Sequence, residues 1–326
     1  MQASDLTATG KSLRFLAAHY RGSPWDSPIR SIQRSLVARG VYGVNNDGGL
    51  TNFTGRGLRK LHLLRNVAML SPHAYLVPIM QPAEGRLFPQ CYWAETVVYG
   101  FDCWPPQYDQ WDALFRRQHS RVAFISARQS AERMRRRVAG LDVIWMPEAI
   151  ELAPYSPDRP LADRSIEVLE LGRRWKTYHD KIRDHCAARG YVHKYEKSPG
   201  QLVFATPDDL LRGLGDSKIS VCFPSSMTHP ARSGDVETMT LRYLEAVACR
   251  CIVVGHSPAE MKDLFGYDPV IEADLNDPTA QIDHILQNLS SFEPLLDRNL
   301  RRLHEVGTWD TRVGTMLDLL RERGYE

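Results

Sequence analysis

The segment GDVETMTLRYLEAVACRCIVVG (234–255) carries two glutamates, Glu237 and Glu245, with seven residues between them. Glu237 lies where a polar loop runs into an expected helix, and Glu245 lies inside that helix. A rise of about 1.5 Å per residue separates the two positions by about 12 Å along the helix axis. This span suits a ligand with a polar group at each end, such as a sugar joined through a diphosphate to a ribose. Two solvated glutamates on an amphipathic helix are the alternative interpretation.

The start of the same helix is a candidate anion site. The first backbone amides of an α-helix have no partner within the helix, and they favour negative charge at its N-terminus. The residues expected there are Thr238, Met239 and Thr240. We therefore expect these amides to be unpaired and to bind an anionic part of the ligand.

A group of cations follows an upstream strand. In VLELGRRWK (168–176) an apolar strand runs into Gly172, and the cations after it are Arg173, Arg174 and Lys176. A glycine lets a ligand approach the backbone, and arginine pairs with phosphate through charged hydrogen bonds. These residues are candidates to bind a diphosphate, whereas a solvated helix start is the alternative.

Two more polar loops follow expected strands in this half. Phe204, Ala205 and Thr206 end one strand, and Ser225 follows another strand over 219–223. Ligands of open α/β sheets bind at the carboxyl ends of the strands. The sequence therefore predicts a nucleotide site spread over several strand ends.

Both halves of the chain alternate expected strands and helices, which predicts parallel sheets covered by helices. In the first half we expect strands at 13–18, 93–99, 122–125 and 143–147, and helices at 29–40, 58–69, 111–118 and 128–138. In the second half we expect strands at 166–171, 191–195, 202–205, 219–223, 251–255 and 270–273. The helices expected in that half cover 177–189, 207–214, 238–249, 258–265, 278–290, 292–305 and 309–323.

The length of the chain, 326 residues, suggests about two domains, because one domain takes roughly 100–200 residues. The segment APYSPDRPLAD (153–163) holds three prolines and few large apolar residues, so it is the best linker candidate. We therefore predict a first domain over 1–158 and a second over 159–326. The predicted fold class is α/β, with two Rossmann-like doubly wound domains facing a cleft.

The second half, over about 166–326, resembles the donor domain of group 1 glycosyltransferases of the GT-B fold. The resemblance follows the order LELGRR, LVFATPDDLLRGLGDSKISVCFPSS, VETMTLRYLEAVACRCIVVG and PAEMKDLF. The closing GTWDTRVGTMLDLL is similar to the family's final helix, which implies that 309–323 returns toward the N-terminal domain. The first half is similar to the family only in its alternation of strands and helices. The resemblance implies that 159–326 binds a sugar nucleotide and that 1–158 is the acceptor side.

In that family the two spaced glutamates are characteristic of retaining enzymes. The resemblance implies that Glu237 lies near the donor hexose and that Glu245 binds the ribose. Arg173 and Lys176 would neutralise the diphosphate leaving group, and 204–206 would border the base. The other residues implied on the donor side are Gly172, Arg174, Ser225, Thr238, Met239 and Thr240.

The sequence departs from the family pattern at two places. The family usually has Gly-Phe-Gly after the first glutamate, whereas Thr-Met-Thr follows Glu237 here, so the donor sugar is left open. The family's lysine commonly stands five or six residues after the arginine, whereas Lys176 stands three residues after Arg173. Lys181 therefore competes with Lys176 for the phosphate role.

The implied reaction moves a sugar from a UDP-, GDP- or other nucleoside-diphosphate donor through an oxocarbenium-like state. Negative charge builds on the departing diphosphate, and preorganised cations and helix-start amides stabilise such charge. The sequence has no Asp-x-Asp motif and no His/Asp cluster with clear metal spacing. We therefore expect no metal and no cofactor, with the sugar nucleotide as substrate. A sugar-nucleotide epimerase or hydrolase, or a non-catalytic subunit that binds sugar nucleotides, is the alternative.

Candidate acceptor residues cluster in YWAETVVYGFDCWPP (92–106), which holds Trp93, Glu95, Asp102 and Trp104. Aromatic rings suit stacking on sugars, and carboxylates suit binding of sugar hydroxyls. Buried tryptophans and a turn-forming aspartate explain the same residues equally well. The expected acceptor is a glycan, a lipid-linked molecule or a small molecule.

The net charge of +2 hides unequal halves. Residues 1–160 hold 20 Lys/Arg and 13 Asp/Glu, a charge of +7, whereas 161–326 hold 21 and 26, a charge of −5. The expected helix at 58–69 is basic and amphipathic, with Arg56, Arg59, Lys60 and Arg65 on or beside it. Segment 56–65 could therefore contact anionic lipid, and a solvated surface helix is the alternative. We expect no nucleic-acid binding, because no basic patch with interleaved aromatic residues appears.

The remaining composition indicates an ordinary globular chain. The six cysteines show no disulfide-dense spacing, and we expect them to be reduced. The N-terminus lacks the basic-then-apolar pattern of a signal peptide, and the apolar runs are far below the ~20 residues of a membrane span. We therefore expect a cytoplasmic protein, with peripheral contact at the inner face of the membrane as the further expectation for 56–65.

Overall fold

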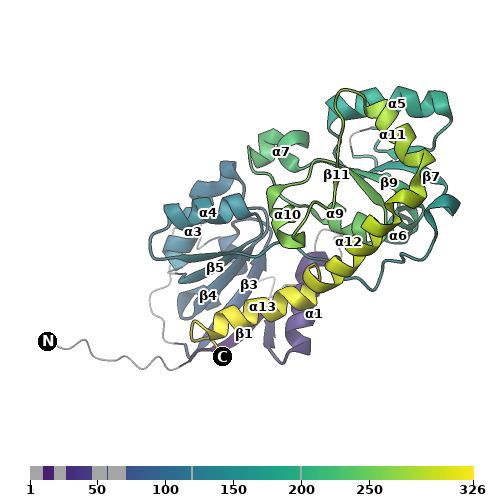
Figure 1. Cartoon of the computed structure of the whole chain (residues 1–326). Coiled ribbons are helices and arrows are strands. Elements are labelled where there is room, and N and C mark those ends of the chain that lie inside the picture. The colour runs from purple at the N-terminus through teal and green to yellow at the C-terminus, as the bar shows by residue number, and fades with distance from the viewer. Residues whose placement is uncertain (1–9, 18–26, 46–56, 58–70, 119, 199) are drawn as a thin grey trace. The chain divides into compact units, whose positions relative to one another are not determined.

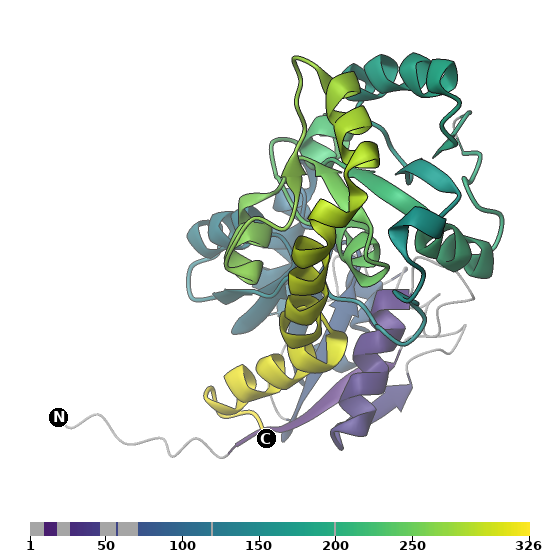
Figure 2. The same ribbon diagram turned by 45° about the vertical axis from the view of Figure 1, so that its right-hand side comes forward.

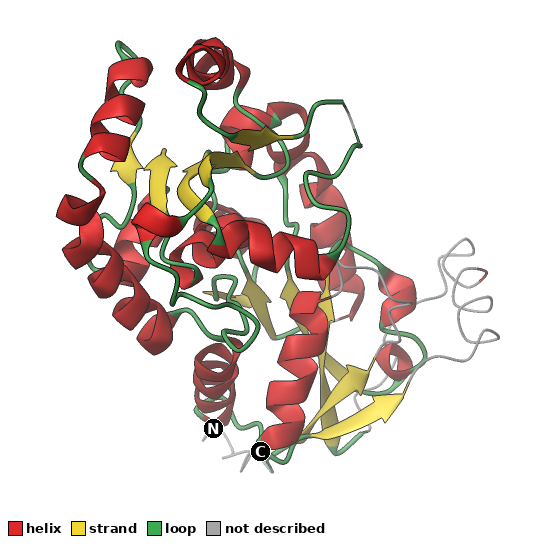
Figure 3. Cartoon of the chain, turned by 90° about the vertical axis from the view of Figure 1, so that its right-hand side faces the viewer, coloured by secondary structure: helices red, strands yellow, loops and turns green. Residues whose placement is uncertain are grey.

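The computed structural model describes residues 10–17, 27–45, 57, 71–118, 120–198 and 200–326 (Figure 1). The chain divides into two compact units. Unit 1 combines Met1–Pro147 with Trp309–Glu326, and unit 2 is Glu148–Thr308. Each unit has its own parallel sheet with helices packed against it (Figure 3). The predicted α/β class with two parallel-sheet domains is confirmed.

The sheet of unit 1 has six parallel strands in the order β2-β1-β3-β4-β5-β6. The strands are β1 (Ser12–Ala17), β2 (Tyr42–Asn45), β3 (His73–Ile79), β4 (Glu95–Gly100), β5 (Val122–Ile125) and β6 (Asp142–Trp145). Their helices are α1 (Ser27–Ala38), α3 (Tyr108–Gln118), α4 (Arg128–Arg137) and α13 (Trp309–Arg321). Every residue of β4 is buried, as expected of a parallel strand covered on both faces.

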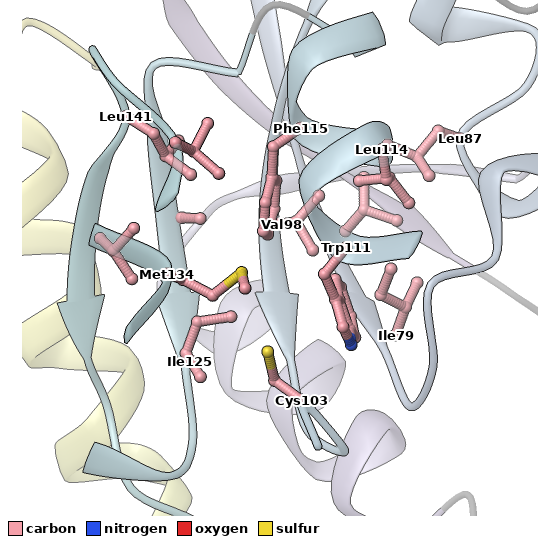
Figure 4. Packing of buried hydrophobic residues seen from close by; sticks show 14 of the residues in the cluster. Ile79, Leu87, Val98, Cys103, Trp111, Leu114, Phe115, Ile125, Met134 and Leu141 are labelled. Carbon is pink, nitrogen blue, oxygen red and sulfur yellow. The ribbon is translucent and has the colours of Figure 1, made fainter. Parts of the chain in front are cut away.

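The core of unit 1 is built where α3 and α4 pack on the sheet (Figure 4). Trp111 and Phe115 of α3 stack with ring centroids 5.7 Å apart. A Cβ added at Gly100 would lie 2.9 Å from the Trp111 ring, so a glycine at the end of β4 lets the indole approach the strand. On another side of the unit, α13 packs beside α1 (Figure 2). Asp310 of α13 pairs there with Arg39 at 2.9 Å.

The sheet of unit 2 has five parallel strands in the order β11-β10-β9-β7-β8. The strands are β7 (Ile166–Glu170), β8 (His193–Tyr195), β9 (Ser217–Cys222), β10 (Ile252–Gly255) and β11 (Ile271–Glu272). Its longer helices are α5 (Lys176–Arg189), α6 (Pro207–Gly215), α9 (Leu241–Ala248), α10 (Ala259–Phe265), α11 (Pro278–Gln287) and α12 (Glu293–Val306). Two single-turn helices, α7 (Ser225–Thr228) and α8 (Pro230–Ser233), follow β9.

Successive side chains of β7 enter two different apolar clusters. Leu169 packs with Tyr243 and Leu244 of α9, whereas Val168 packs with Tyr178 and Ile182 of α5. Side chains alternate between the faces of a strand, so one strand supplies both layers of the core. The carboxyl end of β7, where the predicted phosphate residues begin, is therefore fixed by packing on both faces.

Several predicted elements differ from the structure. The strand predicted at 202–205 is wrong, because this stretch forms bends and Leu202 is 69% exposed. The helix predicted from 238 begins only at Leu241. The strands β2 and β3 were not predicted. The basic helix predicted at 58–69 lies outside the described residues, and so does segment 56–65 apart from Gly57.

The structure bears on the expectations for the cysteines and for membrane-spanning segments. All six cysteines are buried and none forms a disulfide. Within the described residues, no helix has the length and apolar character needed to cross a membrane.

Candidate functional site

The loop after β7 is held in place by Arg242 at the start of α9. The Arg242 guanidinium donates hydrogen bonds to the carbonyl oxygens of Leu171, at 2.5 Å, and Arg173, at 3.2 Å. Gly172 between them has a φ of +66°, a left-handed conformation that favours glycine. The Arg173 side chain is exposed on this pinned loop. It can therefore present its charge to a ligand without any movement of the backbone.

Arg174, the next residue, is half-buried between two side chains. Its guanidinium lies 5.1 Å from the ring centroid of Tyr195 and 2.9 Å from Nε2 of His179. Behind His179, Glu170 forms a buried cluster with His179 and His193, whose potential ligand atoms all lie within 4.8 Å of one another. Sequence reasoning missed this cluster, because the three residues have no recognisable spacing.

The two candidate phosphate lysines have partners of their own. Lys176 is 84% exposed and pairs with Asp180 one turn along α5. Lys181 donates a hydrogen bond to the carbonyl oxygen of Leu275 at 2.6 Å. Both lysines thus already have a partner within the protein, and the competition between them for the phosphate role stays open.

Glu237 lies next to a histidine that follows β10. Its Oε2 is 3.4 Å from Nε2 of His256, and Nδ1 of His256 is 2.9 Å from Oε1 of Glu272. Burial opposes the charge on His256, but the hydrogen bonds and charges of Glu272 and Glu237 outweigh it and raise the pKa of His256. The proximity favours an imidazolium between two carboxylates. Sequence reasoning missed His256, which stands alone in the GHS turn after the strand.

Glu245, the second spaced glutamate, accepts a hydrogen bond from the hydroxyl of Tyr155 at 3.1 Å. Burial raises the pKa of Glu245. Burial also raises the pKa of Tyr155, and the negative charge of the nearby Glu245 carboxylate raises it further. Tyr155 lies in the segment of unit 2 that precedes β7, and sequence reasoning did not single it out. A ribose bound by Glu245 would share the carboxylate with this tyrosine or displace it.

The prediction of unpaired amides at 238–240 is wrong for Met239. Oε1 of Glu260, on α10, accepts hydrogen bonds from the Met239 amide, at 2.5 Å, and from the Thr238 hydroxyl, at 2.6 Å. Glu260 is only 3% exposed. A carboxylate of the protein itself thus occupies this part of the predicted anion site. No feature of PAEMKDLF distinguishes Glu260 from a solvated glutamate in the first turn of a helix.

Three hydroxyls near the predicted donor residues are buried without a partner. The Oγ atoms of Ser226 and Ser257 and the Oγ1 of Thr240 have no hydrogen-bond partner in the described part of the chain. Ser226 and Ser257 follow the carboxyl ends of the neighbouring strands β9 and β10, and Thr240 immediately precedes α9. Ser225, the predicted residue in this group, is 3% exposed. Buried polar groups normally have partners, so these hydroxyls mark a place where a ligand could supply them.

The segment predicted to border the base forms the entry to α6. The Phe204 ring packs against Gly213, where an added Cβ would lie 2.1 Å from it. The Thr206 hydroxyl accepts a hydrogen bond from the Asp209 amide at 3.1 Å and so caps α6. Ala205 between them is exposed. The side chains of Phe204 and Thr206 therefore stabilise α6, whether or not a base lies beside them.

The predicted acceptor residues do not lie at one end of the unit 1 sheet. Trp93 and Glu95 lie at the amino end of β4, whereas Asp102 and Trp104 follow its carboxyl end. The six residues of β4 span about 20 Å, so the two pairs lie near opposite ends of the strand. At the carboxyl end, Trp104 is 7% exposed and its indole Nε1 has no hydrogen-bond partner in the described ranges.

Glu95 is fully buried and already paired. Its carboxylate accepts hydrogen bonds from Arg121, at 2.7 and 2.8 Å, from the Tyr325 hydroxyl, at 2.5 Å, and from Lys11, at 3.1 Å. Both oxygens of Glu95 thus have partners within the protein, which favours a structural role, and the assignment of Glu95 to an acceptor stays a prediction. Trp93 is 43% exposed, but it lies at the same amino end.

No protein-family model matches the sequence, and a comparison with curated proteins finds no match. Solved structures do match at low identity. Sucrose-phosphate synthase from Thermosynechococcus elongatus is 12% identical with a TM-score of 0.63, and the match covers 96% of this chain and 99% of that one.

Two further structures match over nearly their full length. HepE from Anabaena, solved in complex with UDP-glucose, is 10% identical with a TM-score of 0.59, covering 95% of this chain and 99% of that one. AviGT4, a glycosyltransferase involved in avilamycin A biosynthesis, is 12% identical with a TM-score of 0.57, covering 96% and 98%. The chain therefore has the GT-B fold, the two-domain architecture of these glycosyltransferases. The predicted resemblance to that fold is confirmed.

Proposed function

We propose that the protein is a glycosyltransferase that moves a sugar from a nucleoside-diphosphate donor to an acceptor hydroxyl, with retention of anomeric configuration and without a metal. The observation that carries the proposal is the set of buried hydroxyls at Ser226, Thr240 and Ser257, which lack partners in the described residues. A buried polar group left unpaired costs about 1–3 kcal/mol. A ligand rich in hydroxyl and phosphate groups would recover this free energy.

The proposed donor lies at the carboxyl ends of the unit 2 strands. The diphosphate faces Arg173 on the loop that Arg242 pins, and the hexose lies near Glu237. The fold supports this placement, because open parallel sheets bind ligands at this edge. HepE, which shares the fold, was solved with UDP-glucose bound. A UDP-sugar is therefore the first donor to test, with GDP-sugars as the second.

In the proposed reaction the bond between the anomeric carbon and the diphosphate oxygen breaks, and its electron pair stays on the diphosphate. The acceptor oxygen forms the new bond on the same face and loses its proton to the departing phosphate oxygen. Arg173 stabilises the negative charge that develops, and the loop held by Arg242 fixes its backbone in advance. Glu237, next to His256, orients the hexose.

We assign the acceptor to unit 1. Trp104 and Asp102 follow the carboxyl end of β4, and the unpaired Trp104 Nε1 is a donor that a sugar hydroxyl could satisfy. A glycan, a lipid-linked molecule or a small molecule fits this chemistry. The membrane contact proposed for 56–65 would favour a lipid-linked acceptor, and vesicles with anionic lipid test it by co-sedimentation.

A turnover assay tests the proposal. The protein is incubated with UDP-glucose, UDP-N-acetylglucosamine and GDP-mannose, with and without sugar acceptors, and release of nucleoside diphosphate is measured. We expect release that depends on an acceptor, with the α-configuration retained in the product by NMR. Rapid release without any acceptor would instead indicate a hydrolase. Binding of a donor without turnover on any acceptor would indicate a non-catalytic subunit.

A further inference from the structure

The carboxyl end of β7 holds a buried carboxylate between two histidines. Oε1 of Glu170 lies 2.7 Å from Nδ1 of His179, on α5, and 2.8 Å from Nε2 of His193, on β8. Glu170 and His179 are 3% and 4% exposed, and the His193 side chain is 5% exposed. Burial opposes the charge on Glu170, but the hydrogen bonds from both histidines outweigh it and lower the pKa of Glu170. The cluster therefore favours a carboxylate that accepts two N–H groups.

The neighbouring arginine fixes which histidine nitrogen carries a proton. Arg174 lies 2.9 Å from Nε2 of His179. A guanidinium has donors only, so Nε2 of His179 accepts and its Nδ1 carries the hydrogen that is donated to Glu170. His193 donates through Nε2, and its buried Nδ1 has no partner among the described residues. Four side chains thus form a directed chain of hydrogen bonds that starts at Arg174 and converges on Glu170.

A metal ion is the other occupant that a Glu-His-His group suggests, since the three ligand atoms lie within 4.8 Å of one another. A metal-bound histidine donates its other ring N–H to an acceptor such as a carboxylate or a carbonyl oxygen. Here the other nitrogen of His179 faces the Arg174 guanidinium, which cannot accept a hydrogen bond. A metal on Nδ1 would therefore place two donors against each other, and the geometry favours the hydrogen-bond chain.

Arg174 is held from two sides. His179 accepts the one hydrogen bond that Arg174 makes within the described part of the chain, and the Tyr195 ring lies 5.1 Å from the guanidinium carbon. Arg174 has five N–H groups, so most of its donors are left for a ligand. Arg173, the preceding residue, lies on the loop that Arg242 holds. Both arginines therefore follow the carboxyl end of β7.

We propose that His179 is a positioning residue, which with Glu170 and His193 holds Arg174 ready to bind the diphosphate of the nucleotide donor. The inference rests on the proposed function, because it needs a diphosphate ligand at this strand end. Holding the arginine in advance removes the entropy that a free side chain would lose on binding. The chain of hydrogen bonds therefore strengthens binding of the diphosphate, not of the nucleoside.

The test compares UDP with uridine as calorimetric probes on single and double variants. We expect Arg174→Met and His179→Leu each to weaken UDP binding about tenfold, equal to about 1.4 kcal/mol. The double variant should bind UDP no more weakly than Arg174→Met alone, because both changes remove the same interaction. Uridine binding should stay unchanged in all of them. His179→Gln should restore most of the UDP affinity, since its carbonyl oxygen can accept from Arg174.

His185→Gln on the same helix is the matched control. His185 pairs with Asp283 at 3.0 Å and takes no part in the hydrogen bonds that link Arg174 to Glu170. This variant should bind UDP as the unchanged protein does.

The inference is wrong if the unchanged protein binds UDP and His179→Leu, shown by circular dichroism to be folded, binds UDP equally well. Additive losses in the double variant would also contradict it. A stoichiometric transition metal in the purified protein, measured by mass spectrometry, would overturn it in favour of a metal site. Failure of the unchanged protein to bind any nucleotide would instead overturn the proposed function.

Discussion

Oε2 of Glu237 lies 3.4 Å from Nε2 of His256, across 19 residues of sequence. The contact joins the segment before α9 to the turn after β10. Glu272, at the end of β11, contacts the other ring nitrogen at 2.9 Å. The glutamate proposed to face the donor sugar is therefore oriented by a histidine, and that histidine is oriented by a second carboxylate.

Substitution of His256 should impair turnover more than folding. We expect His256→Leu to lower kcat about tenfold or more, because Glu237 loses its contact with the His256 ring. His256→Gln, which can still donate to Glu237, should lie between this variant and the unchanged protein. Steady-state kinetics with a fixed donor measures the effect, and equal kcat values in all three proteins would contradict the role of His256.

The raised pKa of His256 predicts how its contribution to stability depends on pH. A group whose pKa is raised on folding contributes stability that is fully present below its unfolded value, about 6.5, and is lost as pH rises through the folded value. Urea unfolding of the unchanged protein and of His256→Gln should therefore differ most at acidic pH. The difference should shrink toward alkaline pH, and a difference that grows with pH would contradict the ion pairs.

Glu260 should stabilise the segment that carries Glu237. Its carboxylate accepts hydrogen bonds from the Met239 amide and the Thr238 hydroxyl. We expect Glu260→Leu to lower the free energy of unfolding by about 1–3 kcal/mol, because it leaves buried donors unpaired. Glu305→Leu, which removes an exposed partner of Arg302, is the control and should change it by no more than about 0.5 kcal/mol. Similar effects of the two substitutions on urea unfolding would show that the Glu260 contacts contribute little.

Substitution of Glu95 should change the stability of the fold and leave acceptor binding unchanged. Hydrogen bonds from Arg121, Tyr325 and Lys11 outweigh the burial of Glu95 and lower its pKa. A carboxylate with a lowered pKa contributes stability that is present above the unfolded value, about 4.3, and is lost as pH falls through the folded value. Glu95→Gln should therefore cost about 2 kcal/mol at pH 7 and progressively less in acid. A raised acceptor KM with unchanged urea unfolding would favour the acceptor assignment.

Arg312 should be replaceable with a gain in stability. It is 7% exposed on α13, and its Nε and one terminal nitrogen have no hydrogen-bond partner among the described residues. Burial lowers the pKa of Arg312 to about 10. Because a buried guanidinium with two nitrogens unpartnered among the described residues is costly, Arg312→Met should raise the free energy of unfolding by about 1 kcal/mol or more. Arg321→Met, at an exposed position of the same helix, should change it little, and destabilisation by Arg312→Met would show that the guanidinium has a partner.

The fold could be predicted where local sequence patterns decide the structure. Uninterrupted apolar runs such as 252–254 form buried parallel strands, so their positions follow from hydrophobicity alone. The strand β3 was missed because Pro78 lies inside it, and proline is disfavoured within strands. The false strand at 202–205 has the opposite cause, since Leu202 looks like a core residue but is 69% exposed outside any strand. Hydrophobic residues outside the core carry the same local signal as those inside it.

The site could be predicted only in part, because its distinguishing contacts join distant residues. The spacing of Glu237 and Glu245 and the arginines after Gly172 were visible, since each motif is continuous in sequence. The partners His256, Glu260 and Tyr155 were not, because each reaches its target across at least 19 residues. Glu170 sits inside an apolar run and gave no sign of the two histidines that flank it.

Calorimetric binding of UDP-glucose and GDP-mannose to the unchanged protein, Arg173→Ala and Arg183→Ala tests the central claim most directly. Arg183 is an exposed arginine on α5 that pairs with Asp184, so its removal controls for the loss of one charge. We predict that the unchanged protein and Arg183→Ala bind one of the two sugar nucleotides with the same affinity. Arg173→Ala should bind it at least tenfold more weakly. Absence of binding to both nucleotides, or equal binding by all three proteins, would contradict the account.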